Sequence, residues 1–172
     1  MLPPFRVKAL GNQLPFADGS FDLVTANMVM EHIEQPQELL KEVRRVLVPG
    51  GRFVFFTPYS GYYAVAIAKL IPDFLKKPFI KWLEGREAVD VFPTHYKVNT
   101  PKAILRVAGA SGLAVEEVRM IGPKPLTGTH PFLCSLEAPF IRWMQNIDHG
   151  SNLIVSLIKH ERKPRAASAT RW

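Results

Sequence analysis

The chain has 172 residues, of which 47% are apolar and 22% charged, as expected for one globular domain with a hydrophobic core. The formal net charge is +7 and much of the excess lies from Ser151 on, so we predict a domain over residues 1–160 and a basic, disordered tail over residues 161–172. The single cysteine excludes an intrachain disulfide, the apolar runs are too short to span a membrane, and no basic face with stacking aromatic groups points to nucleic acid.

The first predicted elements are two strands separated by turns. Residues 5–9 lean apolar and could form a short strand, which the turn at Gly11–Gln13 ends. A second turn signal at Asp18–Ser20 precedes Phe21–Ala26, whose composition is that of a buried strand.

A helix and a further strand follow. Pro36 suits the first turn of a helix, where its missing N–H costs nothing. The apolar side chains from Leu39 to Leu47 share one face of that helix, and Pro49–Gly51 ends it. The unbroken apolar run Phe53–Phe56 is typical of a strand covered on both faces. Strand, helix and strand at this spacing predict a βαβ unit and a partly parallel sheet.

The pattern changes over residues 61–99. Two short helical stretches, interrupted by Pro72 and Pro78, mix aromatic residues with lysines, and an irregular segment follows from Glu84 to Asn99. Regular elements then return, because Thr100 has the side chain of a helix cap and Pro101 that of a first helical residue. Gly112 ends this helix, and a strand, a helix and a final strand are predicted over residues 113–121, 131–147 and 152–158. The fold class is therefore α/β.

One continuous stretch resembles a known family. Leu14–Val24 (LPFADGSFDLV), the pair Glu31-His32 and Val48–Gly51 together resemble the middle of a class I S-adenosylmethionine (SAM)-dependent methyltransferase of the type-11 group. The segments around Asp90–Tyr96 and Asn99–Pro101 look like one bacterial subgroup of it. The family's Rossmann-like sheet has the strand order 3-2-1-4-5-7-6. The resemblance implies that this chain supplies strands 4, 5, 6 and 7. Strand 3 is left open, and residues 5–9 could form it.

The resemblance also implies that the methyl donor SAM is bound by an incomplete site. The family binds SAM with a G-x-G loop after strand 1, an acidic residue ending strand 2 and an acidic residue near the adenine. None of the eleven glycines here forms a G-x-G, the ribose-binding acid has no counterpart, and the adenine position is Leu10. A βαβ unit needs about 30 residues, so we expect an N-terminally truncated domain that lacks strands 1 and 2.

The remaining cofactor contacts implied by the resemblance form two groups. The first would lie by the adenine and the second, at the carboxyl end of strand 4, near the sulfonium and the reacting methyl group. The first group is Asn12, Gln13 and Leu14, and the second is Ala26, Asn27 and Met28.

Residues on the acceptor side are expected after strands 4 and 5 and after the insertion. These are Glu31, Thr57, Tyr59 and Tyr96. Methyl transfer mainly needs alignment and desolvation, and a general base helps only if the acceptor holds a proton at neutral pH. His32 and His95 are the two candidates for that base, with a structural hydrogen-bonding role as the alternative for each. The histidines show no paired ligand spacing, so we predict no metal site.

Three functions remain open. The segment at about 61–99 lies where the family carries its substrate cap, with a second helical insertion at about 130–148, and its aromatic residues suggest a small or lipid-like acceptor. Alternatively, the chain is a non-catalytic remnant or subunit, whose exposed strand 4 pairs with a partner chain or a second copy. A third alternative is peripheral membrane contact through Tyr62–Leu83, because helices on membrane surfaces also combine lysines with apolar residues. No basic segment followed by an apolar one opens the sequence, so we expect no signal peptide and a cytoplasmic location.

Overall fold

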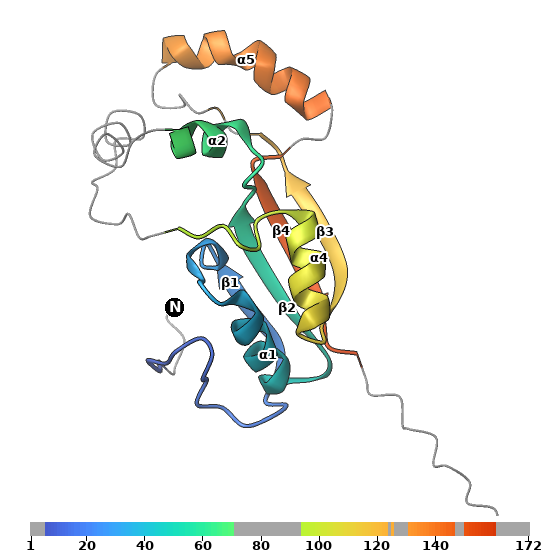
Figure 1. Ribbon diagram of the computed structural model, residues 1–172. Helices are drawn as coiled ribbons and strands as arrows, with labels where there is room; N and C mark the ends of the chain where they lie inside the picture. The colour runs from blue at the N-terminus through green and yellow to red at the C-terminus, as the bar shows by residue number, and fades with distance from the viewer. Residues whose placement is uncertain (1–5, 71–93, 124, 126–130, 147–149, 161–172) are drawn as a thin grey trace, which may run out of the picture.

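A computed structural model describes residues 6–70, 94–123, 125, 131–146 and 150–160 (Figure 1). One twisted sheet is covered by two helices, and two more helices lie beyond one end of it. In chain order the elements are β1 (Phe21–Asn27), the 3-10 helix η1 (Met30–His32), α1 (Pro36–Val46), β2 (Leu47–Pro58), α2 (Tyr63–Leu70), α4 (Pro101–Ala110), β3 (Ala114–Ile121), α5 (Pro131–Asn146) and β4 (Asn152–Ile158).

The sheet has the strand order β1-β2-β4-β3. β1 and β2 are parallel, with Ala26 opposite Phe55, whereas β4 runs antiparallel to β2 and to β3. This order is the 4-5-7-6 half of the family sheet, so the mixed α/β fold implied by the resemblance is confirmed.

The strand expected at residues 5–9 does not form in its described part. Residues 6–9 have no regular structure, and Leu10 makes only an isolated bridge, in which its carbonyl accepts a hydrogen bond from Gln13 N at 3.0 Å. A strand needs a paired neighbour to satisfy its backbone groups. In the family order that neighbour is strand 2, and the described residues supply none, so the prediction of strand 3 is wrong for residues 6–9.

The boundary between α1 and β2 also differs from the prediction. α1 begins at Pro36 as predicted, but it ends at Val46, and β2 starts directly at Leu47. Pro49–Gly51 is therefore a bend within β2 and not a separate turn. The bend needs glycine twice, because Gly50 has φ +80° and a Cβ on Gly51 would lie 2.9 Å from the Val48 carbonyl oxygen.

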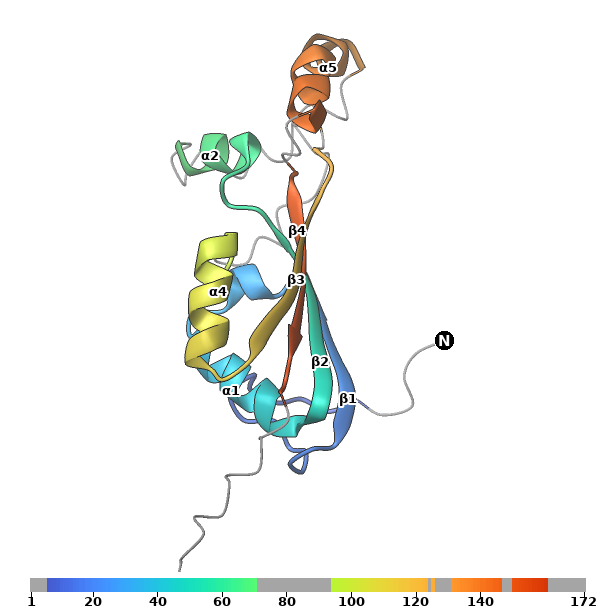
Figure 2. The same cartoon turned by 90° about the vertical axis from the view of Figure 1, so that its right-hand side faces the viewer.

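The helices cover only one face of the sheet. α1 and α4 pack together on that face (Figure 2), and α4 has the predicted cap, in which Thr100 Oγ1 accepts from Ala103 N at 3.2 Å. The buried cluster between helices and sheet consists of Met30, Leu40, Val43, Leu47, Phe53, Phe55, Val98, Ile104, Val107, Ala108, Leu113, Leu153, Val155 and Leu157.

The opposite face of the sheet is open in the described part of the chain. Val54 and Phe56 alternate with the buried Phe53 and Phe55, so they point to this face and stay half-buried. Leu23 on β1 is exposed. The prediction that Phe53–Phe56 is covered on both faces is therefore wrong for the described chain, because α1 and α4 both lie on the other side.

α2 and α5 lie beyond the end of the sheet where β2 runs out (Figures 1 and 2). α5 agrees with the helix predicted over residues 131–147, and α2 is the described part of the helical stretches predicted over residues 61–83. Residues 71–93 of the predicted insertion and the tail 161–172 lie outside the described residues. None of the described helices is long and apolar enough to cross a membrane.

Candidate active site

The carboxyl end of β1 turns sharply away from the sheet. Ala26 is half-buried within the strand and Asn27 is exposed at its end. Met28 then adopts φ +52°, which is uncommon outside glycine, while its N–H still donates to the Phe56 carbonyl at 2.9 Å. This turn leaves the side chains of Asn27 and Met28 exposed at the edge where the parallel strands end.

A buried carboxylate follows directly. Glu31 in η1 is only 3% exposed, and its Oε2 accepts a hydrogen bond from Thr57 Oγ1 at 3.0 Å. Asn99 Nδ2 donates to the same Thr57 oxygen at 2.7 Å and to the Pro58 carbonyl at 2.9 Å. Thr57 and Asn99 are fully buried. We call Glu31, Thr57 and Asn99 the buried triad.

The direction of these hydrogen bonds is fixed by chemistry. The Pro58 carbonyl can only accept, so the amide nitrogen of Asn99 must face it and Thr57. The single hydroxyl proton of Thr57 is then available for Glu31. Asn99 Oδ1 is left buried without a hydrogen-bond partner in the described structure. Such orphaned acceptors are rare and costly, and they demand an explanation at the place where they occur.

The segment after residue 93 is fastened onto η1. The backbone N–H groups of His95 and Tyr96 both donate to the Glu31 carbonyl, at 2.7 and 3.2 Å, and Tyr96 adopts φ +50°. Ser60 N donates to the Asn99 carbonyl at 2.9 Å, so the same segment is also tied to the end of β2. Both ends of the predicted insertion therefore meet at the buried triad.

His32 lies beside the buried carboxylate. Its Nε2 is 4.0 Å from Glu31 Oε1, and its side chain is 32% exposed where that of Glu31 is 4% exposed. His95 differs, because its side chain is exposed and its backbone amide makes the described contact with Glu31. The 4.0 Å separation allows charge attraction but is longer than the hydrogen bond that usually joins a general base to its orienting group.

The structure brings the predicted acceptor-side residues to one edge. Glu31 and Thr57 are hydrogen-bonded to each other, and Tyr59, half-buried after β2, donates its N–H to the Ser151 carbonyl at 2.9 Å. Asn99 was not predicted as part of this site. Its sequence signals were its place before the capping Thr100 and its part in the Asn99–Pro101 resemblance. Neither signal carries information about burial beside Thr57.

The predicted adenine-side residues lie elsewhere, along α1 (Figure 1). Leu14 N donates to Glu42 Oε1 at 2.8 Å, and Arg45 Nη2 donates to the Leu14 carbonyl at 3.0 Å. Arg45, through its hydrogen bonds, and then the Leu14 N–H lower the pKa of Glu42 to about 2. Asn12 and Gln13 are exposed on the turn before it. The described structure therefore fixes the two predicted cofactor groups in different places.

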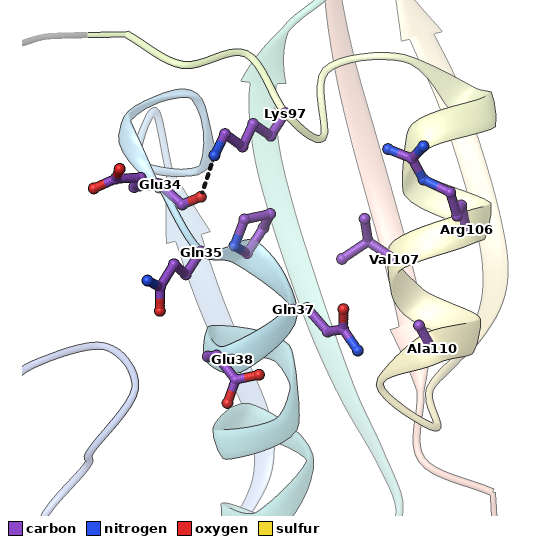
Figure 3. Close-up of a pocket in the computed structure, with 9 residues that line it drawn as sticks. Glu34, Gln35, Gln37, Glu38, Lys97, Arg106, Val107 and Ala110 are labelled. Atoms are coloured by element: carbon purple, nitrogen blue, oxygen red, sulfur yellow. Dashed lines mark hydrogen bonds between the residues drawn. The ribbon is translucent and has the colours of Figure 1, made fainter.

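A hollow of about 540 Å³ lies between the start of α1 and α4 (Figure 3). Lys97 Nζ donates to the Glu34 carbonyl at 2.8 Å across its rim. The two cations and two carboxylates of this hollow balance in charge, so it does not favour an anionic ligand. None of the predicted site residues lines it; its lining is Glu34, Gln35, Pro36, Gln37, Glu38, Lys97, Arg106, Val107 and Ala110. No group of three or more potential metal ligands occurs within the described ranges.

Comparison with known proteins finds similar domains and folds. The family model of the methyltransferase domain matches residues 4–55. The crystal structure of an S-adenosylmethionine-dependent methyltransferase from Mesorhizobium loti superposes with a TM-score of 0.54 at 26% identity, covering 87% of this chain and 67% of that one. Residues 4–55 are thus similar to a methyltransferase domain. A Haloferax volcanii methyltransferase, solved in complex with the activator Trm112, shares the fold with a TM-score of 0.56 at 18% identity, covering 88% of this chain and 59% of that one.

The relatives in sequence are matched over short stretches. An uncharacterized methyltransferase of Mycolicibacterium gilvum is 43% identical over 61 residues, which are 33% of this chain and 24% of that protein. A demethylmenaquinone methyltransferase of Corynebacterium glutamicum is 41% identical over 75 residues, or 40% of this chain and 33% of that protein. The matches thus cover about a quarter to a third of the length of these relatives.

Proposed function

We propose that this chain acts in SAM-dependent methyl transfer and forms the acceptor side of the reaction cleft. The observation that supports this most strongly is the buried triad beside His32, at the edge where the parallel strands β1 and β2 end. Open α/β sheets bind their ligands at the carboxyl ends of parallel strands. A buried carboxylate and an orphaned amide oxygen at that edge are costly for stability and favour a role in function.

The residues at the carboxyl edge fit the methyl-bearing part of SAM, because the exposed Asn27 and Met28 offer an amide and a thioether there. Leu14, with Asn12 and Gln13, is proposed for the adenine, but the described structure holds Leu14 against Glu42 and Arg45 of α1, separate from that edge. The sequence given contains no G-x-G to approach the methionine part. When bound, SAM supplies a methyl group activated by the sulfonium charge.

In this proposal His32 accepts the proton of the methyl acceptor. Its Nε2 lies 4.0 Å from Glu31 Oε1, so a buried carboxylate stands behind the imidazole. Thr57 and Asn99 hold that carboxylate in place from the other side. His95 is the second candidate for the base, supported by the hydrogen bond between its backbone N–H and the carbonyl of Glu31.

The acceptor in this proposal is small or lipid-like. Tyr59 lies two residues after Thr57 and Tyr96 three residues before Asn99, and both would line the acceptor side. The aromatic side chains of α2 and α5, which lie at the same end of the sheet, support a hydrophobic acceptor.

The test is transfer of a radiolabelled methyl group from SAM to a bacterial extract of lipids and small molecules. We expect labelled product with the wild-type chain and about a 10²-fold or greater loss with His32→Gln, the usual contribution of a general base. His160→Gln is the matched control, because His160 is exposed after β4, away from this edge. The absence of labelled product with the wild-type chain, or equal losses in both variants, would contradict the proposal.

A second candidate function is that of a subunit. β1 ends the described sheet with several exposed side chains, and an uncovered edge strand is a site for pairing with another chain. A partner or a second copy that supplies strands 1 and 2 would complete the sheet. Co-purification of a small Rossmann-like protein supports this candidate, whereas micromolar binding of SAM to the isolated chain in calorimetry speaks against it.

A further inference from the structure

Two residues at the carboxyl edge have a backbone conformation that favours glycine. Met28 has φ +52° and Tyr96 has φ +50°. The other described residues with a positive φ are all glycines, namely Gly19, Gly50 and Gly112. A side chain in this left-handed region crowds its own backbone, so a long or aromatic residue is uncommon there. Met28 and Tyr96 therefore break a local rule that the rest of the described chain obeys.

The backbone around Met28 explains its conformation but not its side chain. The Met28 N–H donates to the Phe56 carbonyl at 2.9 Å while the chain leaves the sheet for η1, in which Met30 is fully buried. Glycine would allow this exit without strain. The Met28 side chain is 45% exposed. Packing in the core is therefore not the reason for a methionine at this position.

Tyr96 also has a backbone reason for its conformation. The N–H groups of His95 and Tyr96 converge on the Glu31 carbonyl, at 2.7 and 3.2 Å. A left-handed residue lets neighbouring N–H groups point to one oxygen, as in the backbone nests that bind anions. These hydrogen bonds use the backbone alone, so glycine would serve equally well. The tyrosine side chain is not needed for this contact.

The position of the two residues separates them from the glycines. Met28 lies two residues before η1, and Tyr96 is hydrogen-bonded to Glu31 within it. The three glycines lie near the starts of β1, β2 and β3, at the opposite end of the sheet. Left-handed residues other than glycine cost stability, and they cluster at ligand-binding and active sites. The strained pair thus occurs only at the edge that holds the buried triad, as far as the chain is described.

We propose that the side chains of Met28 and Tyr96 contact the bound reactants, and that they stand in place of glycine at a cost in stability. This inference rests on the proposed methyl transfer and gives the two side chains different parts in it. The thioether of Met28, exposed beside Asn27, contacts the methyl-bearing part of SAM. Tyr96, held against Glu31, contacts the methyl acceptor.

Pairs of glycine and alanine variants separate the backbone from the side chain. Both substitutions remove the side chain, but only glycine accepts the left-handed conformation without strain. We expect Met28→Gly and Tyr96→Gly to melt at least about 2 °C above Met28→Ala and Tyr96→Ala. Val29 is the matched control, because it is 42% exposed and has an ordinary φ of −119°. Val29→Gly should therefore melt below Val29→Ala.

Kinetics with radiolabelled SAM and the bacterial extract test the side chains. We expect the KM for SAM to rise at least about fivefold in both Met28 variants, because a contact with SAM is lost. In both Tyr96 variants the rate of label transfer at saturating SAM should fall by a similar factor, with the KM for SAM unchanged. The higher melting temperature of the glycine variants should not restore either loss. The Val29 variants should keep wild-type kinetics.

Three results would overturn the inference. The first is that glycine melts below alanine at Met28 or Tyr96, as at Val29, which would disprove the strain whatever the fate of the proposed function. The second is that the glycine variants melt higher and keep wild-type kinetics, so that the side chains are not needed. The third is a wild type that transfers no label from SAM. This result contradicts the proposed function and the role of the two side chains, while the melting temperatures still report the strain.

Discussion

Two polar clusters of the sheet have almost the same chemical parts and opposite surroundings. In the buried triad, Glu31 accepts from the hydroxyl of Thr57, which accepts from the amide of Asn99. On the open face, Glu116 of β3 accepts from the hydroxyl of Ser156 at 2.8 Å and from the guanidinium of Arg52 at 2.7 Å. We call Arg52, Glu116 and Ser156 the surface triad.

The buried triad and the surface triad differ in the group that donates through nitrogen. The surface triad contains a cation, and the hydrogen bonds from Arg52 and then Ser156 lower the pKa of Glu116 to about 2. The buried triad has a neutral amide in its place and leaves Asn99 Oδ1 unpartnered. An exposed, charge-paired cluster joins strands at little cost, whereas a buried cluster without its own cation is maintained for another reason. The comparison therefore supports the site proposed at the carboxyl edge.

The largest effect on stability is expected from Thr57→Val. Valine keeps the shape of threonine but removes the hydroxyl, so Glu31 Oε2 loses its donor and Asn99 Nδ2 one acceptor. We expect the free energy of unfolding to fall by about 3 kcal/mol, the upper range for an unsatisfied buried group next to a carboxylate. Urea denaturation measures it, with Thr25→Val on the open face as the control. If Thr57→Val and Thr25→Val lower the free energy of unfolding equally, the hydroxyl in the buried triad matters no more for stability than one on the open face.

A smaller, pH-dependent effect is expected at α1, from Glu42→Gln. Because the pKa of Glu42 is lowered from 4.5 to about 2, its ionised form stabilises the fold at pH values above about 4.5. This contribution is lost as the pH falls toward 2. The wild type should exceed the variant by about 1 kcal/mol at pH 7, and the two should converge in acid. Thermal unfolding at several pH values measures this difference. If the wild type exceeds Glu42→Gln by the same amount at every pH from 7 to 2, the charge of the Glu42 carboxylate does not stabilise the fold.

The smallest effect is expected from Glu116→Gln in the surface triad. The pair with Arg52 is exposed, so water and salt screen most of its attraction. The melting temperature should hardly change at physiological salt, and a small loss should be visible only at low salt. A large loss that persists in high salt would mean that the surface triad resembles the buried one.

Much of the fold follows from local sequence signals. Pro36, Pro101 and Thr100 fix two helix starts through their backbone and capping chemistry, and the family resemblance supplies the order of the four strands. The predictions were wrong where the structure of a segment depends on another element packed or paired with it. Residues 6–9 alternate basic and apolar side chains, as a strand can, but the described residues offer them no strand to pair with. Phe53–Phe56 has the pattern of a strand covered on both faces, although the described helices lie on one face.

The site was predictable only for residues beside the motifs. Glu31 and His32 follow one strand recognised from the sequence, and Thr57 lies at the end of the next, so their meeting at one edge could be expected. Asn99 contacts Thr57, which lies 42 residues earlier in the sequence, and neither periodicity nor spacing predicts such a long-range contact. The side-chain roles of the predicted cofactor and acceptor residues stay predictions.

Methyl transfer by two isosteric variants tests the central claim most directly. Glu31→Gln removes the buried charge behind His32, and Glu116→Gln removes the exposed one on the open face. With radiolabelled SAM and the same extract, we expect at least about a tenfold loss for Glu31→Gln, since the base loses its charged support, and wild-type activity for Glu116→Gln. Full activity of Glu31→Gln, or equal losses in both variants, would contradict the account.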